Sequence, residues 1–319
     1  AYRLQAGGQI CRIQSVVGGE THMNRKKTSM GRKVFLAVDV IVILLLCLIC
    51  MVPLLNLLAY SFSASQPIIE NKVFLWPKEF TLKAYQYVLE SKEFWSSVSV
   101  SVKRVLLGVP LNTLLTILVA YPLSKDERQF KARKYYVAYM LTVMLFNGGL
   151  MPTYYIVSKT KLIDTVWALI IPGAVPIFNC IVLMNFFRGI PSELEESAKL
   201  DGASQWQILW RIFIPISKPS LATIILFSLI NHWNSWFDGL IYSNHTTNYP
   251  LQSYLQTLVT STTEILAQGD VKAIAKLVDI NDTNMKAAQI FISVIPLMLI
   301  YPFLQKYFTT GLTMGSVKG

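Results

Sequence analysis

Polar side chains gather among aromatic ones near position 235, toward the end of a long apolar run. A polar group at membrane depth is costly to keep from water, so each one there is a candidate for function. Amide groups beside aromatic faces suit a sugar, which presents both hydroxyls and apolar C–H surfaces. Hydrogen bonding between neighbouring helices is the alternative role. The cluster contains Asn231, His232, Asn234, Ser235 and Asp238 together with Trp233, Trp236 and Phe237.

We take part of this cluster as candidates to line a path for a solute. His232 taken alone is better explained as a packed, hydrogen-bonded histidine than as a ligand. Three asparagines in other apolar runs, Asn147, Asn179 and Asn185, are weaker candidates of the same kind. The candidates from the cluster itself are Asn231, His232, Trp233, Asn234 and Trp236.

Arg104, preceded by Lys103, opens the second apolar run, over 98–121. Its long side chain could extend back to the outer interface of a membrane, as arginines near span ends do. The sharper hypothesis is that Arg104 faces the solute path and favours acidic oligosaccharides, because a guanidinium binds carboxylates with two parallel hydrogen bonds.

The sequence lacks the residue patterns of an enzyme. His232 and Asp238 are six residues apart, so on one continuous helix they would point to nearly opposite faces. There is no phosphate-binding loop, no H-E-x-x-H, no G-x-S-x-G and no zinc-type cluster. Cys47 and Cys50 lie in an apolar run and are expected to be small buried hydrophobes. We therefore expect no catalytic residue, no metal and no cofactor on this chain.

The composition indicates an integral membrane protein. Hydrophobic residues make up 53% of the chain and charged residues 15%, against about 25% charged in a soluble domain. The net charge of +11 is spread between apolar runs, which is a sign of membrane topology and not of nucleic-acid binding.

Apolar runs of about 20 residues or more can cross a hydrocarbon core, and the chain has six of them. We therefore predict an all-α membrane fold with six transmembrane helices. The third run is interrupted by Asn147-Gly148-Gly149 and Pro152, a break that needs a protein or water-filled surrounding. The predicted spans cover residues 34–60, 98–121, 135 onward, 166–187, 221–242 and 288–308.

Short basic clusters place one side of these spans in the cytoplasm. They lie at residues 25–33, 125–134 and 188–218, so both termini and the loop 189–219 are expected inside. Segments 61–96 and 243–287 are then outer loops, the second with an amphipathic helix over 266–278. Residues 31–319 form the transmembrane domain. Residues 1–30 are expected to be a disordered arm, of which 1–22 precede Met23 and are suspected to be non-native.

The loop 192–219 reads as two short helices joined by a glycine. Ser192 and Glu195 have the spacing of a capping box, which predicts a helix start. Gly202 supplies a left-handed residue to end that helix. A second helix is expected over 204–214, with Pro215 and Pro219 turning the chain back to the bilayer. An amphipathic connector lying on the membrane would show the same pattern.

The residues of this loop closely resemble a known family signature. Glu196-Ser197-Ala198-Lys199-Leu200-Asp201-Gly202-Ala203, followed by Ile214-Pro215, is similar to the EAA loop of ABC-importer permeases, with Ser197 where alanine is usual. Residues 146–154 and 232–237 resemble the carbohydrate-uptake branch of that family, the binding-protein-dependent inner-membrane components. The resemblance covers roughly residues 31–319. It implies the type I importer fold, with this loop as a cytoplasmic coupling helix.

The resemblance also implies a function and partners. The chain would be the permease subunit of an importer that moves a sugar or oligosaccharide, acidic ones included, by alternating access across the bacterial inner membrane. It would work with a second homologous permease chain, two ATPase subunits that hold the ATP and Mg²⁺, and an extracytoplasmic solute-binding protein. The implied coupling residues are Glu195, Glu196, Ala198, Asp201, Gly202, Ala203 and Pro215.

Three alternatives stay open at this point. The permease could carry a peptide, an amino acid or a polyamine, since the loop itself does not specify the cargo. A stand-alone secondary carrier would favour internal repeats and carboxylates within the spans, and only Asp39 and Asp238 come near. An intramembrane enzyme would need a paired catalytic set at one depth, for which His232 and Asp238 are the nearest match.

Overall fold

The computed structural model describes residues 30–146, 148–257 and 282–315. Residues 1–29, Asn147 and the helix expected over 266–278 lie outside that part of the chain. The regular elements of the described residues are helices, and turns and irregular segments join them; one isolated antiparallel bridge pairs Ser63 with Phe80. The chain divides into two compact units, Ala1–Pro53 and Leu54–Gly319, and each is considered by itself.

The first unit contributes most of helix α2, Met30–Ser61. The helix continues through Pro53 and has no acidic residue in its first turn. Its apolar side chains are largely exposed, for example Leu45 at 53% and Ile49 at 67%. A helix with apolar side chains exposed on all sides is stable only when lipid or another protein chain covers them.

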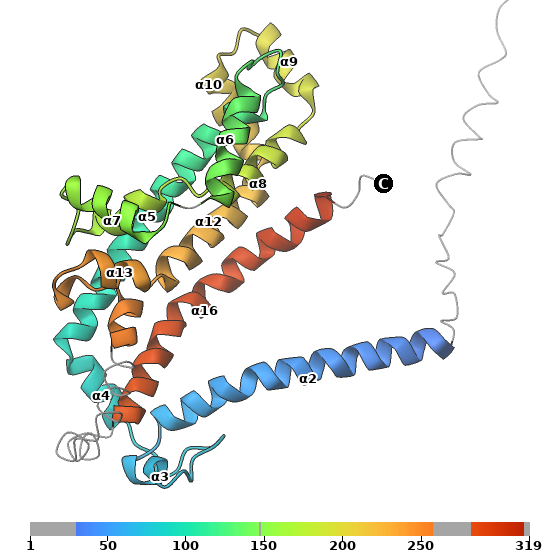
Figure 1. Ribbon diagram of the computed structural model, residues 1–319. Helices are drawn as coiled ribbons and strands as arrows, with labels where there is room; N and C mark the ends of the chain where they lie inside the picture. The colour runs from blue at the N-terminus through green and yellow to red at the C-terminus, as the bar shows by residue number, and fades with distance from the viewer. Residues whose placement is uncertain (1–29, 147, 258–281, 316–319) are drawn as a thin grey trace, which may run out of the picture. The chain divides into compact units, whose positions relative to one another are not determined.

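The second unit is built around α5, Lys92–Ser124, which packs against α8, Ile177–Arg188, and α12, Lys218–Asn234 (Figure 1). Helix α16, Asp282–Gly315, runs along α12. The Ser91 hydroxyl caps α5 by accepting a hydrogen bond from the Phe94 amide. α5 therefore begins six residues before the predicted span, because the cap and not hydrophobicity sets its start.

Breaks in the apolar helices are a general feature of this unit. Among the described residues two helices, α2 and α5, are long and apolar enough to cross a membrane, and the number rises to five if each bent pair is one span. In α16 the described apolar part is Asn284–Ile300. In the first bent pair, α6, Arg133–Leu145, meets α7, Leu150–Lys159, at 110°. In the second, Val166–Gly173 meets α8 at 48°, and the segment Val166–Gly173 consists of η1, Val166–Leu169, and η2, Ile171–Gly173. In the third, Gln205–Ile216 meets α12 at 83°.

The fifth predicted span is wrong in one respect. It was expected to be continuous over 221–242, but α12 ends at Asn234 and a short helix α13, Phe237–Tyr242, follows. Ser235 between them has extended backbone, with φ −71° and ψ 122°. The sequence has no proline or glycine at this point, so the break depends on side-chain contacts described below.

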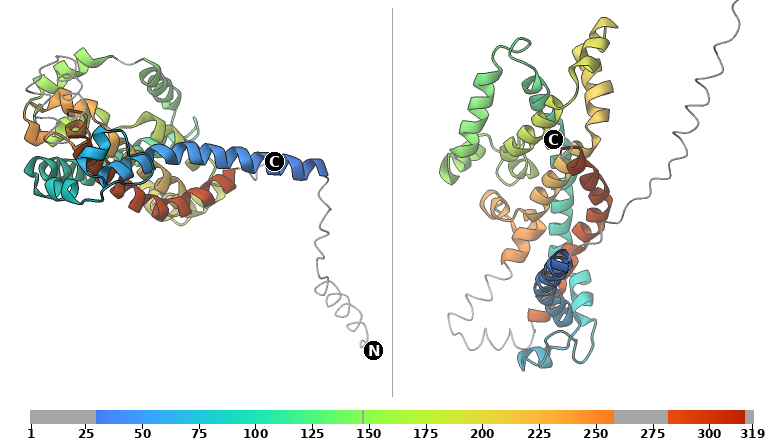
Figure 2. Two further views of the ribbon diagram at one scale, coloured as in Figure 1. Left: turned by 90° about the horizontal axis from the view of Figure 1, so that it is seen from below. Right: turned by 90° about the vertical axis from the view of Figure 1, so that its right-hand side faces the viewer.

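Short helices fill the predicted outer segments. They are α3, Ser65–Ile69, α4, Lys83–Glu90, and η4, Thr246–Asn248. α4 packs against α16 and α5 around the buried side chains of Val88, Phe94 and Trp233. Figure 2 shows the backbone of the chain from two further sides. The Asp164 carboxylate accepts hydrogen bonds from Asn248, Asn244 and His245. These bonds lower the pKa of Asp164, and the bond from the Asn248 side chain has the largest effect.

Candidate functional sites

The loop 192–219 has the predicted helix–turn–helix form. Helix α9, Ser192–Leu200, is followed by Gly202 at φ +78°, which confirms the left-handed residue. The Ala203 amide donates to the Ala198 carbonyl at 2.9 Å and the Gly202 amide donates to the Lys199 carbonyl at 3.0 Å. These two bonds form a Schellman motif, which satisfies the last carbonyls of α9.

The second half of the loop is helical up to the turn into α12. It consists of α10, Gln205–Ile208, the π-helical turn η3, Leu209–Phe213, and α11, Ile214–Ile216. Pro215 therefore lies inside the helical segment and does not stop it. The bend of 83° comes after Ile216, before Pro219 occupies the first turn of α12.

The predicted capping box of Ser192 and Glu195 does not form. The N-cap position of α9 is Pro191, and no side chain caps it. The box occurs instead in the next helix, where the Gln207 amide donates to the Ser204 hydroxyl and the Ser204 amide donates to the Gln207 side chain. Glu195 is drawn away from the helix start because two lysines bind its carboxylate.

Glu195 is 8% exposed and joins α9 to the end of α5. Lys125 Nζ lies 2.7 Å from one carboxylate oxygen and Lys199 Nζ lies 2.8 Å from the other. Burial would raise the pKa of Glu195, but the hydrogen bonds from the two lysines outweigh it and lower the pKa. Burial lowers the pKa of Lys125, in opposition to its bond with Glu195.

Lys125 also sits over two aromatic rings. Its Nζ is 4.0 Å from the ring centroid of Tyr121 and 4.3 Å from that of Phe213. Such cation–π contacts offset part of the cost of desolvating the ammonium group. The sequence assigned Lys125 only to a basic cytoplasmic cluster, because its pairing with Glu195 spans 70 residues.

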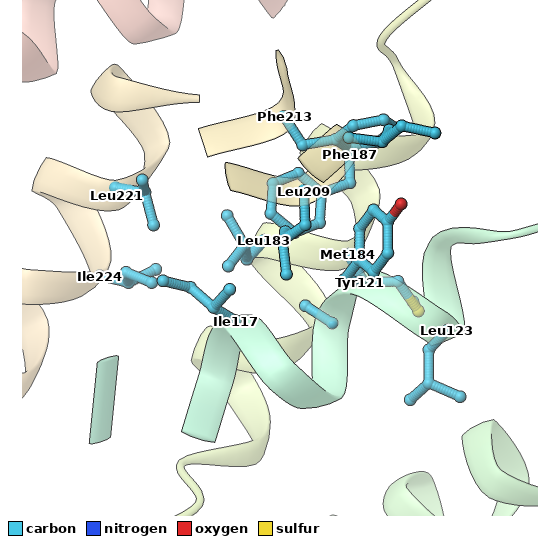
Figure 3. Close-up of a cluster of buried hydrophobic side chains, with 12 residues drawn as sticks. Ile117, Tyr121, Leu123, Leu183, Met184, Phe187, Leu209, Phe213, Leu221 and Ile224 are labelled. Carbon is cyan, nitrogen blue, oxygen red and sulfur yellow. The ribbon is translucent and has the colours of Figure 1, made fainter. Parts of the chain in front are cut away.

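An aromatic cluster beneath the loop ties it to the helices (Figure 3). Tyr121, Phe187 and Phe213 meet edge to face, with centroids 5.1 to 6.3 Å apart. The Tyr121 hydroxyl donates to the Gln205 side chain at 2.7 Å. Leu183 and Leu209 are fully buried in the same cluster. The loop is therefore a packed extension of the helices and not a connector lying loosely on a surface.

The seven implied coupling residues divide into an inner and an outer group. Glu195 is buried, and Ala198 and Ala203 are half-buried against the aromatic cluster. The outer group is exposed, as are the apolar side chains of Leu200 at 89% and Trp206 at 61%. It consists of Glu196, Asp201, Gly202 and Pro215.

Arg104 is buried, with 2% of its surface exposed, so the expectation that it extends to the outer interface is wrong. Its two terminal nitrogens donate to the two carboxylate oxygens of Asp238. Its Nε donates to His232 Nδ1 at 3.3 Å, and a terminal nitrogen also donates to the Ser235 carbonyl at 3.3 Å. In this arrangement the guanidinium is directed at protein groups.

His232 and Asp238 do not point to opposite faces, contrary to the helical prediction. The extended residue Ser235 breaks the helix between them, so both side chains meet Arg104 on α5. They do not form a catalytic pair, because Arg104 donates to the His232 Nδ1 atom and to both oxygens of Asp238.

The contact with Arg104 determines the proton position on His232. Since Nδ1 accepts, the proton is on Nε2, which then donates to the side-chain oxygen of Asn112 at 3.1 Å. The Asn112 amide in turn donates to the carbonyls of Gly108, at 3.2 Å, and Ala174, at 3.3 Å. This polar network, Arg104, Asn112, His232 and Asp238, joins α5 to the breaks near α8 and α12.

The predicted substrate-path residues separate into two sets. Asn231, Asn234 and Trp236 are exposed and line a shallow hollow with Ser235 and other neighbours. The other set is buried: His232 belongs to the polar network, and Trp233 is 6% exposed and donates to the Ser293 carbonyl at 3.1 Å. The sequence grouped them because they are adjacent, whereas the helix places them on different faces.

Comparisons with known proteins agree with this architecture. A family model described as "Binding-protein-dependent transport system inner membrane component" matches residues 28–314. Protein LplC of Bacillus subtilis is 40% identical over 85% of this chain and 90% of its own. The polygalacturonan/rhamnogalacturonan transport system permease protein YtcP, also of Bacillus subtilis, is 37% identical over 87% and 96%.

A solved structure shares the fold over almost its full length. It is a chain of a bacterial ABC transporter involved in the import of the acidic polysaccharide alginate. The TM-score is 0.78 at 30% identity, and the match covers 88% of this chain and 98% of the other.

Proposed function

The chain belongs to the family of binding-protein-dependent transport system inner membrane components, and we propose that it is the permease subunit of an ATP-driven importer of sugars or oligosaccharides. The similarity to YtcP and to the alginate transporter chain supports a carbohydrate cargo. The proposed topology has six spans, with both termini and the loop 189–219 in the cytoplasm. A water-filled path beside the breaks would account for them, because irregular backbone at membrane depth is tolerated where it lines such a path.

The family's name supports a binding protein as partner, and the resemblance of the loop 192–219 to the EAA loop supports the other proposed partners. The proposed partners are an extracytoplasmic solute-binding protein, a second homologous permease chain and two ATPase subunits, which hold ATP and Mg²⁺. The chain itself is then a non-catalytic subunit without a cofactor. Closure of the ATPases on ATP would move the loop and change which side the spans open to.

The loop is the single observation that carries this proposal. It combines an exposed face with Leu200 and Trp206 and an inner face anchored through Glu195 to α5. Exposed apolar side chains on a rigid element are typical of a surface that docks another protein. Because the inner face is packed, a force applied to α9 is passed to the long helix α5.

Affinity purification of the whole chain from its native membrane in mild detergent tests the proposal. Mass spectrometry should find a second six-span chain and an ATPase with a phosphate-binding loop in the complex. If the chain purifies alone or only with its own copies, the coupling role of the loop fails. The second test is loss of uptake of a labelled oligosaccharide in a strain that lacks this chain.

A permease for a non-sugar solute is the second candidate, because the loop does not read the cargo. Equal uptake of labelled oligosaccharide with and without the chain, together with an intact complex, would favour it. The carrier and enzyme alternatives lose support: the family model covers residues 28–314, and Asp238 is bound to Arg104 and is not free to hold an ion.

A further inference from the structure

Three contacts of Arg104 converge on the break between α12 and α13. We propose that Arg104 is a positioning residue, which clamps this break through Asp238 and so sets the exposed hollow formed by Asn231, Asn234 and Trp236. Arg104 then acts on the cargo through the shape of that hollow and not through its own charge. The role of the hollow in transport rests on the proposed function.

The clamp holds the chain at three successive points. Arg104 contacts His232 in the last turn of α12, the Ser235 carbonyl in the break, and Asp238 in the first turn of α13. The Ser235 carbonyl has no partner in a continuing helix, so the guanidinium supplies one. An arginine reaches all three points because its guanidinium is a planar fork with several donors. A lysine has a single nitrogen at its tip and cannot bind all three at once.

The Asp238 carboxylate accepts hydrogen bonds from several protein groups. Besides those from Arg104, it accepts a hydrogen bond from the Ser235 hydroxyl at 2.8 Å and one from the Gly239 amide at 2.9 Å. The two bonds from Arg104 to this carboxylate direct the guanidinium at Asp238, so its charge is compensated within the protein and not by a cargo anion.

The far side of the break is held as tightly. The Ser253 hydroxyl donates to the Trp236 carbonyl at 2.6 Å. Gly239 packs so closely that an added Cβ would meet Ser253 and lie 2.6 Å from Pro250. Residues 235–239 are therefore held by Arg104 on one side and by Ser253 on the other.

The position of residues 235–239 determines how the hollow is built. Asn231 and Asn234 belong to α12, before the break, whereas Trp236 and Phe237 follow it. The rings of Trp236 and Phe237 meet edge to face at 5.7 Å. A change at the break therefore moves the aromatic part of the hollow relative to its amide part.

The experiment compares Arg104→Gln, Asp238→Asn and the double variant in the intact importer. Uptake of an oligogalacturonide and of a neutral galacto-oligosaccharide of the same length is measured at equal membrane levels. Each single variant should lose about tenfold or more on both sugars, since a buried charge loses its partner, and the double variant should recover most of that loss. Lys103→Gln removes a charge from the same turn at an exposed position and should change neither rate.

Two results would overturn the clamp. One is loss of the acidic sugar alone in Arg104→Gln with no recovery in the double variant, which would make Arg104 an anion-reading residue. The other is additive loss in the double variant. Arg104→Lys is the further check: the clamp predicts loss of both sugars although the charge is kept.

A stability measurement separates this inference from the proposed function. The wild-type chain, Arg104→Gln, Asp238→Asn and the double variant are purified in detergent, and their thermal unfolding is followed. Non-additive shifts in Tm, with the double variant closer to the wild type than either single variant, support the clamp even if neither sugar is transported. Additive shifts count against it whatever the cargo is.

Discussion

The polar network around Arg104 and the loop around Glu195 each pair a carboxylate with cationic partners, half-buried Asp238 in one and buried Glu195 in the other, and they are built differently. Asp238 receives a forked arginine with 3% of its side chain exposed, whereas Glu195 is shared by two lysines, of which Lys199 is 36% exposed. The first arrangement fixes a backbone break in the spans. The second joins a helix to a span end and keeps one partner in water.

This difference has an energetic consequence. A buried pair that loses one partner leaves an uncompensated charge, and the cost depends on whether the remaining group can reach water or lose its proton. Arg104 can do neither, because an arginine is effectively always charged. Lys125 can release a proton more readily, since burial lowers its pKa. We therefore expect the network in the spans to be the less tolerant of the two.

The largest expected effect is that of Asp238→Asn. It should destabilise the purified chain by roughly 3–5 kcal/mol, because Arg104 stays buried and charged without its counter-ion. Glu195→Gln should cost distinctly less, since Lys125 can lose its proton. Thermal unfolding of both variants in one detergent measures the difference. An equal loss of stability would show that the two pairs are energetically equivalent.

The next effect in size is that of Gly108→Ala. A Cβ at this position would lie 2.5 Å from His232 Nε2, so the imidazole ring must move and its bonds to Arg104 and Asn112 are strained. Overpacking of this kind costs about 1–3 kcal/mol. Gly173→Ala is the matched control, because no atom lies within 4 Å of its Cβ position. Unfolding temperatures that match in the two variants would contradict the tight fit.

In the loop, Gly202→Val should act on coupling more than on stability. The residue is exposed at φ +78°, and a branched side chain there costs roughly 1–2 kcal/mol of local strain. We expect the two permeases to stay together while the ATPase is lost or uncoupled, as shown by co-purification and ATP hydrolysis per sugar imported. Gly202→Asn tolerates the left-handed region and should retain most uptake. Normal uptake by the valine variant would count against the loop's role.

The smallest effect is a pH dependence of the loop's attachment. The pKa of Glu195 lies below its ordinary value of 4.5 in the folded chain, so its contribution is present above that value and is lost as the pH falls through the folded pKa. Hydrogen exchange of the α9 amides, corrected for intrinsic rates, should therefore speed up below about pH 4.5. In Glu195→Gln this acid limb should be absent. An identical acid limb in the variant would assign it to another group.

Much of the loop was predictable from sequence because its determinants are local. α9 ends through bonds from the Gly202 and Ala203 amides to carbonyls three and five positions back, and Pro191 lies at its N-cap. The capping box was misplaced for the opposite reason. The carboxylate of Glu195 accepts a hydrogen bond from Lys125, which is 70 residues distant, and not from the backbone at the start of its own helix.

By itself, the sequence determined the membrane character of the chain, the approximate positions of its apolar helices, the turn at Gly202 and the family, since composition and short-range spacing carry all four. Only the tertiary structure decided the break at Ser235, the separation of Trp233 from Trp236 and the pairing of Arg104 with Asp238. That pairing joins residues 134 positions apart. Its physical reason is that a buried arginine must find its charge partner wherever the packed helices bring one, and the backbone of α12 yields to let Asp238 reach it.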